Sequence, residues 1–172
     1  MNSTNWKEIA ELVGIAAIVA SLVFVGLELR QSHEIAIAAE YQERAASVID
    51  QYNAQIQSDT ALSVVGKPLY EAVRSADFPD EYRHLYEGYT VEQLGFTMIN
   101  TLNALTAFDN IYFQYQSGFI SDESWQAFRY RLRRVLESPI TRQLLEKDPN
   151  WYRASYRQLC NEMITEIDSD GD

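Results

Sequence analysis

The chain has 172 residues, of which 47% are hydrophobic, and a formal net charge of −11. This acidic balance argues against nucleic acid and against anionic lipid surfaces as partners of the whole domain, because like charges repel. Cys160 is the single cysteine, which excludes an intrachain disulfide and is typical of a domain on the reducing side of a membrane.

The first uncharged segment, residues 12–27, contains no charged residue and Ser21 as its one polar residue. Extended to residues 9–29, it reaches the roughly twenty residues that a membrane-spanning helix needs. A buried core helix is the alternative explanation for this composition. The residues before the segment are barely basic, which argues against a secretory signal peptide. We therefore expect residues 1–30 to hold a short tail and a transmembrane helix.

No proline interrupts residues 7–57, so the helix is expected to continue past the membrane as a stalk over residues 31–58. In the membrane half, one face carries mostly small residues, which allow helices to approach closely in lipid. These candidate helix-packing residues are Ala10, Gly14, Ala17, Ser21, Phe24 and Glu28. Along residues 35–56 the same face alternates aliphatic and polar residues, which fits either a coiled-coil seam or packing against the chain's own bundle.

Glu28 is the one charged residue on that face near the membrane edge. In a homo-oligomer it would form a ring of carboxylates at the mouth of a cation-conducting pore. The alternative is a carboxylate at the end of the span that simply reaches water, close to Arg30.

Residues 59–167 show helical signals throughout and predict a bundle, followed by an acidic tail at residues 168–172. The fold class is therefore all-α, with an N-terminal transmembrane helix that continues into a long stalk helix and packs with a helical bundle. The second uncharged segment, residues 93–108, is as long as the first but carries six polar residues, which suits a packed soluble helix.

Start and stop signals divide the bundle into helices. We expect a short helix over residues 61–76, a turn at 77–80 and a long helical stretch up to Gly118 that can break at Gly88. The helix starts within or after this stretch are indicated by a capping box at Thr90 and Gln93, a cap at Ser121, and the pairs Ser138–Pro139 and Asp148–Pro149. The last helix is expected to end at Ile167.

Asp109, Asn110 and Gln114 lie within a run of apolar and aromatic residues. Polar groups in such surroundings form either a satisfied buried network or the floor of a pocket. They are the candidate polar pocket of a ligand-sensing or enzymatic bundle.

Four arginines form the one basic cluster of the acidic domain, namely Arg129, Arg131, Arg133 and Arg134. They are expected to pair with the surplus carboxylates, and the alternative is docking of phosphate or an acidic partner. No catalytic or metal site is expected. Glu81 and His84 have the spacing of di-iron ligands, but no second such pair exists. Cys160 has no nearby histidine to activate it. We expect no cofactor.

Two blocks of sequence carry a resemblance. The first comprises residues 11–14 and 22–31, and the second comprises residues 109–120. With these blocks the chain resembles an uncharacterised family of small bacterial single-span inner-membrane proteins with a C-terminal helical domain, although Glu28 and Ser32 depart from the glutamine and asparagine of that pattern. The resemblance implies a bacterial inner-membrane location and supplies no activity.

The sequence thus predicts a non-enzymatic, membrane-anchored scaffold or accessory subunit. Its expected partners are the lipid bilayer and either further copies of itself or a larger membrane protein complex. The basic residues that follow the span, Arg30 and Arg44, favour a cytoplasmic position for the C-terminal domain. The pore with a Glu28 ring and the bundle with a polar pocket remain the alternatives.

Overall fold

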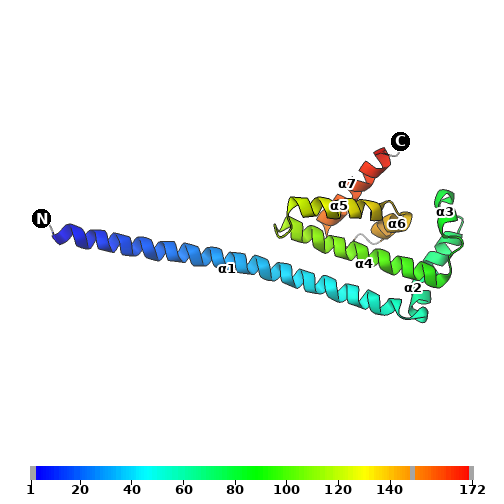
Figure 1. Ribbon diagram of the computed structural model, residues 1–172, viewed down its shortest axis with the longest axis horizontal. Coiled ribbons are helices and arrows are strands. Elements are labelled where there is room, and N and C mark those ends of the chain that lie inside the picture. The colour runs from blue at the N-terminus through cyan, green and yellow to red at the C-terminus, as the bar shows by residue number, and fades with distance from the viewer. Residues whose placement is uncertain (1–2, 148–149, 171–172) are drawn as a thin grey trace. The chain divides into compact units, whose positions relative to one another are not determined.

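The computed structural model describes residues 3–147 and 150–170, and in these residues it shows seven helices and no strand. This confirms the predicted all-α class, with a long N-terminal helix and a helical bundle (Figure 1). The helices are α1 (Ser3–Ile56), α2 (Asp59–Arg74), α3 (Asp80–Tyr86), α4 (Val91–Gln116), α5 (Asp122–Leu136), α6 (Pro139–Lys147) and α7 (Ala154–Asp170).

The chain divides into two compact units, residues 1–40 and residues 41–172. Helix α1 belongs to both, and it is uninterrupted, as the absence of proline predicts. Every residue of the first uncharged segment, 12–27, is exposed in this chain. The helix is long enough and apolar enough to cross a membrane, and none of its most apolar stretch is buried by the protein.

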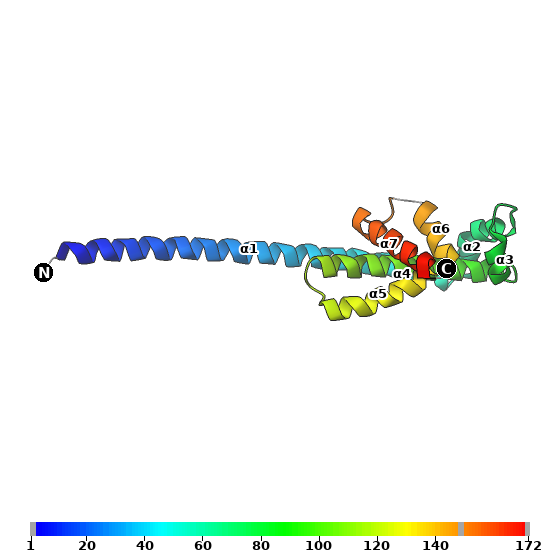
Figure 2. The same cartoon turned by 90° about the horizontal axis from the view of Figure 1, so that it is seen from above.

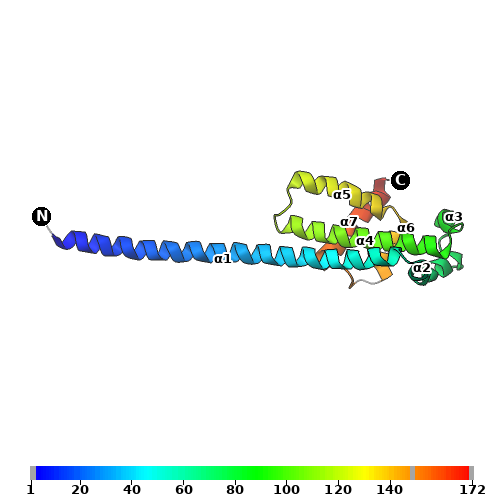
Figure 3. The same cartoon turned by 60° about the horizontal axis from the view of Figure 1, so that its bottom comes forward.

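The second unit is a bundle built around α4. Figure 2 shows α5 on one side of α4 and α6 on the other, and Figure 3 shows α5 running back along α4 after the connecting loop. One core cluster joins α2, α3, α4 and α6 and contains Leu69, Val73, Phe78, Tyr86, Leu94, Leu102, Ile140 and Leu144. A second joins α4 to α5, α6 and α7 and contains Leu105, Leu132, Leu136, Leu145, Tyr152, Tyr156, Cys160 and Met163.

Two glycines allow α2 and α4 to touch backbone to backbone. A methyl group added to Gly66 would lie 1.9 Å from the carbonyl oxygen of Val91, and one added to Gly95 would lie 2.0 Å from the carbonyl oxygen of Leu62. Any side chain at either position would push the two helices apart. Glycine is therefore required at both positions for this contact between α2 and α4.

The predicted start signals are confirmed where the structure describes them. The Thr90 hydroxyl accepts from the backbone N–H of Gln93, whose side chain accepts from the N–H of Thr90, and this capping box begins α4. Ser121 caps α5, and α6 begins at Pro139. The other proline signal, Asp148–Pro149, lies outside the described residues.

The end of α1 packs into the bundle, so the face over residues 41–56 is used within the chain. Ala45 is buried, Tyr52 packs against the first core cluster, and the Asn103 amide donates to the side-chain oxygen of Asn53 over 3.2 Å. The bundle unit therefore begins at Tyr41, which is earlier than the stalk boundary expected near residue 58.

The expected end of the last helix at Ile167 is wrong. Helix α7 continues through Asp170, and Asp168 and Asp170 pair with arginines of α6 and α5, so the described part of the predicted acidic tail is helical. The sequence suggested an end because carboxylates at a helix C-terminus oppose the helix dipole. The arginines offset that repulsion.

Candidate functional site

Asp109 is the one charged residue that is buried within the described part of the chain. It lies on α4, and both of its carboxylate oxygens accept hydrogen bonds. The Tyr41 hydroxyl donates to Oδ2 over 2.6 Å, and the Nε of Arg153 donates to Oδ1 over 2.9 Å. Three segments far apart in sequence thus meet at one carboxylate, whose charge is balanced by a guanidinium.

Arg153 is held by more than this ion pair. Its guanidinium also donates to the backbone carbonyl of Asp109 over 2.7 Å and to the side-chain oxygen of Gln116 over 3.1 Å. The same group lies 5.3 Å from the ring centre of Tyr41 and 5.0 Å from that of Phe113, close enough for cation–π attraction. Because so many contacts hold it, Arg153 fixes the start of α7 against α4.

A groove of about 360 Å³ opens beside Asp109. Four of the side chains that line it are aromatic, and Trp151 is 54% exposed at its edge. The lining residues are Tyr41, Arg44, Ala45, Val48, Tyr52, Thr106, Asp109, Trp151 and Tyr152. An apolar concave surface with a few polar groups at its base is the usual form of a small-molecule site.

The ionisable groups of this site are shifted by burial. Burial raises the pKa of Asp109, and the hydrogen bond from Tyr41 and the charge of Arg153 oppose that rise. Burial, followed by the hydrogen bond to Asp109, raises the pKa of Tyr41 to about 12. Tyr41 therefore stays a hydrogen-bond donor at neutral pH, and both carboxylate oxygens of Asp109 accept hydrogen bonds. The arrangement therefore suits a structural role better than proton transfer.

Of the three residues proposed for the polar pocket, Asp109 lines the groove, whereas Asn110 and Gln114 are absent from its lining. Asn110 is partly buried, and its amide oxygen has no hydrogen-bond partner within the described residues. Asp109 belongs to a satisfied network and to a groove at once. Sequence reasoning missed Tyr41 and Arg153. The position of Arg153 directly after Trp151 and Tyr152 was the available signal.

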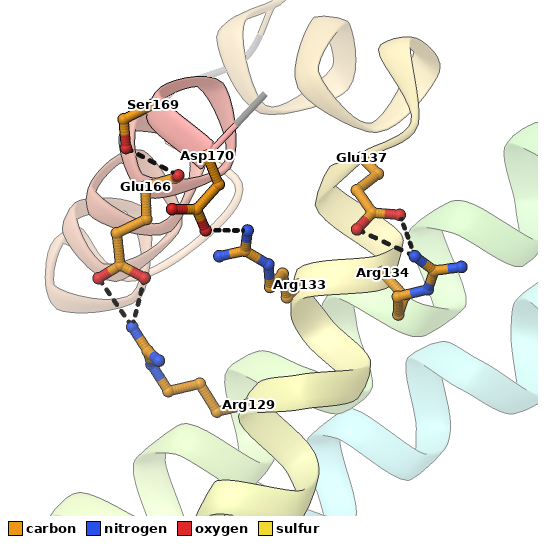
Figure 4. Close-up of polar contacts among 7 residues, drawn as sticks. All are labelled: Arg129, Arg133, Arg134, Glu137, Glu166, Ser169 and Asp170. Carbon is orange, nitrogen blue, oxygen red and sulfur yellow. Dashed lines mark hydrogen bonds and ion pairs between the residues drawn. The ribbon is translucent and has the colours of Figure 1, made fainter. Parts of the chain in front are cut away.

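Ion pairing of the arginine cluster is confirmed for three of its four members (Figure 4). Arg129 binds both carboxylate oxygens of Glu166 over 2.8 and 2.7 Å. Arg133 binds Asp170 over 2.6 Å, and Arg134 binds Glu137, the residue directly after α5, over 2.9 Å. The fourth member, Arg131, lies 5.9 Å from the ring centre of Phe128.

The proposed helix-packing residues in the first unit all lie on exposed helix where their positions are described. Gly14 has no atom within 4 Å of an added methyl group, and the Ser21 hydroxyl donates to the carbonyl of Ala17 over 2.9 Å. Arg30 pairs with Glu34 over 3.1 Å.

The described residues contain no group of three or more histidine, cysteine or acidic side chains that could hold a metal ion. Cys160 is buried, and burial raises the pKa of its thiol to about 12. A thiol that stays protonated at neutral pH is a poor nucleophile.

No family model, curated protein or solved structure matches the chain.

Proposed function

We propose that the chain is a non-enzymatic scaffold or accessory subunit, anchored in a bacterial inner membrane by a single span and assembled with further copies of itself or with a larger membrane complex. The observation that carries this proposal is the contrast within the chain. The apolar part of α1 is wholly exposed, whereas the bundle closes its own core.

An exposed apolar surface that surrounds a helix on every side needs an apolar environment. A bilayer supplies that environment over the length of residues 9–29. The bundle then lies outside the membrane. The basic residues Arg30 and Arg44 after the span, against the single basic residue Lys7 before it, favour the cytoplasmic side for the bundle.

Assembly through the span is supported by the small residues on one face of the helix. Gly14 and Ala17 leave room for a second helix backbone, and van der Waals packing of this kind drives helix association in lipid. A matched pair of substitutions tests it. Ala17→Leu adds bulk on the proposed interface, and Ala16→Leu makes the same change on another face of the helix.

The readout is the mass of the complex after gentle extraction from native membranes. A multiple of 19.8 kDa supports self-assembly, and co-purifying proteins in fixed ratio support an accessory subunit. In either case Ala17→Leu is expected to lower the mass of the complex, and Ala16→Leu is expected to leave that mass unchanged. A lone monomer in the native extract would overturn the assembly proposal, and equal effects of the two variants would overturn this interface.

A second candidate function, ligand binding by the bundle, is favoured by the aromatic groove beside Asp109. Trp151 lies at its edge and is exposed, so its fluorescence would report an occupant. A metabolite that shifts this fluorescence saturably in the native chain but not in Tyr52→Ala, which removes one lining ring, would support it. A library that gives no saturable shift would count against it.

A further inference from the structure

Three arginines of the bundle pair with the acidic last turn of α7, two of them on one face of the helix and the third on the opposite face. Arg129 and Arg133, one helical turn apart on α5, bind Glu166 and Asp170 of α7, as Figure 4 shows. Arg142 of α6 binds Asp168 over 2.8 Å. We call Arg129, Arg133 and Arg142 the arginine patch, and residues 166–170 of α7 the acidic cover.

Apart from Ile167, the acidic cover is held by ion pairs. The last side chain of α7 that packs on a core cluster is Ile167. The last turn contains no basic residue, so its carboxylates oppose the helix dipole. The carboxylate side chains of Glu166, Asp168 and Asp170 are 49%, 58% and 67% exposed. Exposed ion pairs are individually weak and are screened by salt, so the cover can be exchanged for another anion.

The arginine patch is partly buried while the cover is in place. Its side chains are only 35%, 28% and 24% exposed. The Nε of Arg142 is further fixed by donating to the carbonyl of Leu136 over 2.8 Å. Arginine forks match phosphate oxygens in a bidentate geometry that a lysine cannot reproduce. Arg129 and Arg133, one turn apart on the same face of α5, can engage one multiply charged group.

We infer that the acidic cover is a displaceable, autoinhibitory contact over a phosphate-binding arginine patch, and that a multiply charged phosphate group displaces it. One such molecule can replace the carboxylates of both Glu166 and Asp170 at Arg129 and Arg133. The sources of this chemistry are anionic lipid headgroups and soluble polyphosphates. The inference does not depend on membrane anchoring, because the patch and its cover lie entirely within the bundle unit.

The displacement is measured on the full chain in neutral detergent micelles, with a nitroxide on Ser169→Cys. The native Cys160 is buried and escapes labelling. Titration with tripolyphosphate at constant ionic strength is expected to raise the mobility of this label saturably. A second label on Asn161→Cys, an exposed position earlier on α7, is the control and stays unchanged. No saturable change at position 169 would overturn the inference.

Affinity supplies an independent test by calorimetry with the same anion. The variant E166Q/D168N/D170N has no competing cover and is expected to bind tripolyphosphate about tenfold more tightly. The control D50N/E71Q/E92Q has the same change in net charge on other helices and is expected to bind like the native chain. Equal increases in affinity in the two variants would mean that net charge alone causes the effect and would overturn the inference.

Two further measurements distinguish a lipid headgroup from a soluble polyphosphate as the source of the phosphate. Micelles doped with phosphatidylglycerol are compared with micelles doped with phosphatidylcholine, both without tripolyphosphate. Increased mobility of the label at position 169 in phosphatidylglycerol alone assigns the patch to lipid headgroups. Increased mobility with tripolyphosphate alone assigns it to a soluble ligand. R129Q/R133Q is expected to abolish either response, and a response that persists in this variant would exclude the arginine patch.

Discussion

Two segments of sixteen uncharged residues, 12–27 and 93–108, have opposite surroundings in the same chain. All residues of the first are exposed, whereas the second contributes Leu94, Ile99, Leu102 and Leu105 to the bundle interior. The second segment also bears polar residues on its other faces, and the first has only Ser21. The absence of charge therefore does not decide the environment of a helix. The angular distribution of polar residues does.

The largest expected effect is the difference in stability between an alanine substitution at Gly95, in the second segment, and one at Gly14, in the first. Gly95→Ala should lower the free energy of unfolding of the bundle by about 3 kcal/mol, because the new methyl group meets the Leu62 carbonyl across the contact of α2 and α4. Gly14→Ala, with open space around it, should change it by less than about 0.5 kcal/mol. Urea unfolding of both variants in micelles, followed by near-ultraviolet circular dichroism, checks this. Similar losses would contradict the contact.

A charge in the middle of the first segment tests whether lipid is its environment. Val19→Arg should cost about 2.5–3.5 kcal/mol of membrane insertion and move the chain out of the carbonate-washed membrane fraction. Val64→Arg makes the same change at an exposed valine of α2 and should leave fractionation unaltered. If Val19→Arg remains in the washed membranes as fully as the native chain, the first segment is not the anchor.

Alkaline pH should weaken the bundle through the core that the second segment shares with α7. Burial raises the pKa of the Cys160 thiol from 9.0 to about 12, so the unfolded chain releases this proton first. Stability is lost as pH rises above about 9, by about 1.4 kcal/mol at pH 10. Between pH 8 and pH 10, the free energy of unfolding measured with urea should fall less in Cys160→Ala than in the native chain. An unchanged loss would mean that other groups cause it.

The smallest expected effect concerns the N-cap of α4, the helix that contains the second segment. The second segment begins just after the Thr90 cap, and Thr90→Ala should cost the bundle about 1 kcal/mol. Thr165→Ala serves as the control, because the Thr165 hydroxyl bonds a carbonyl within α7 and caps no helix start. Thermal melts of the two variants, compared with the native chain, measure the difference.

Much of the fold can be predicted from the sequence because its signals are local. The Thr90–Gln93 capping box, the Ser121 cap and the proline at the start of α6 each act within one turn of the backbone. The uninterrupted α1 follows from the absence of proline, and the pairing of the arginine cluster follows from the surplus of carboxylates.

The missed features depend on partners distant in sequence. The end of α7 at Asp170 depends on Arg133, which is 37 positions earlier. The candidate site joins Tyr41, Asp109 and Arg153 from three elements, and no spacing rule connects them. Asp109 was found because a carboxylate is conspicuous among aromatic residues. Tyr41 has ordinary surroundings in the sequence, and the aromatic pair before Arg153 does not identify its partner, so both residues become significant only when the helices pack.

The contact between α2 and α4 also has a thermodynamic consequence. Gly66 and Gly95 face one another, since a methyl group on Gly66 would lie 2.6 Å from the backbone nitrogen of Gly95. Once alanine at either position has separated the helices, alanine at the other meets a gap that already exists. The two substitutions should therefore be strongly non-additive, with a double variant little less stable than the worse single one. In energetic terms, the two glycines behave as one position.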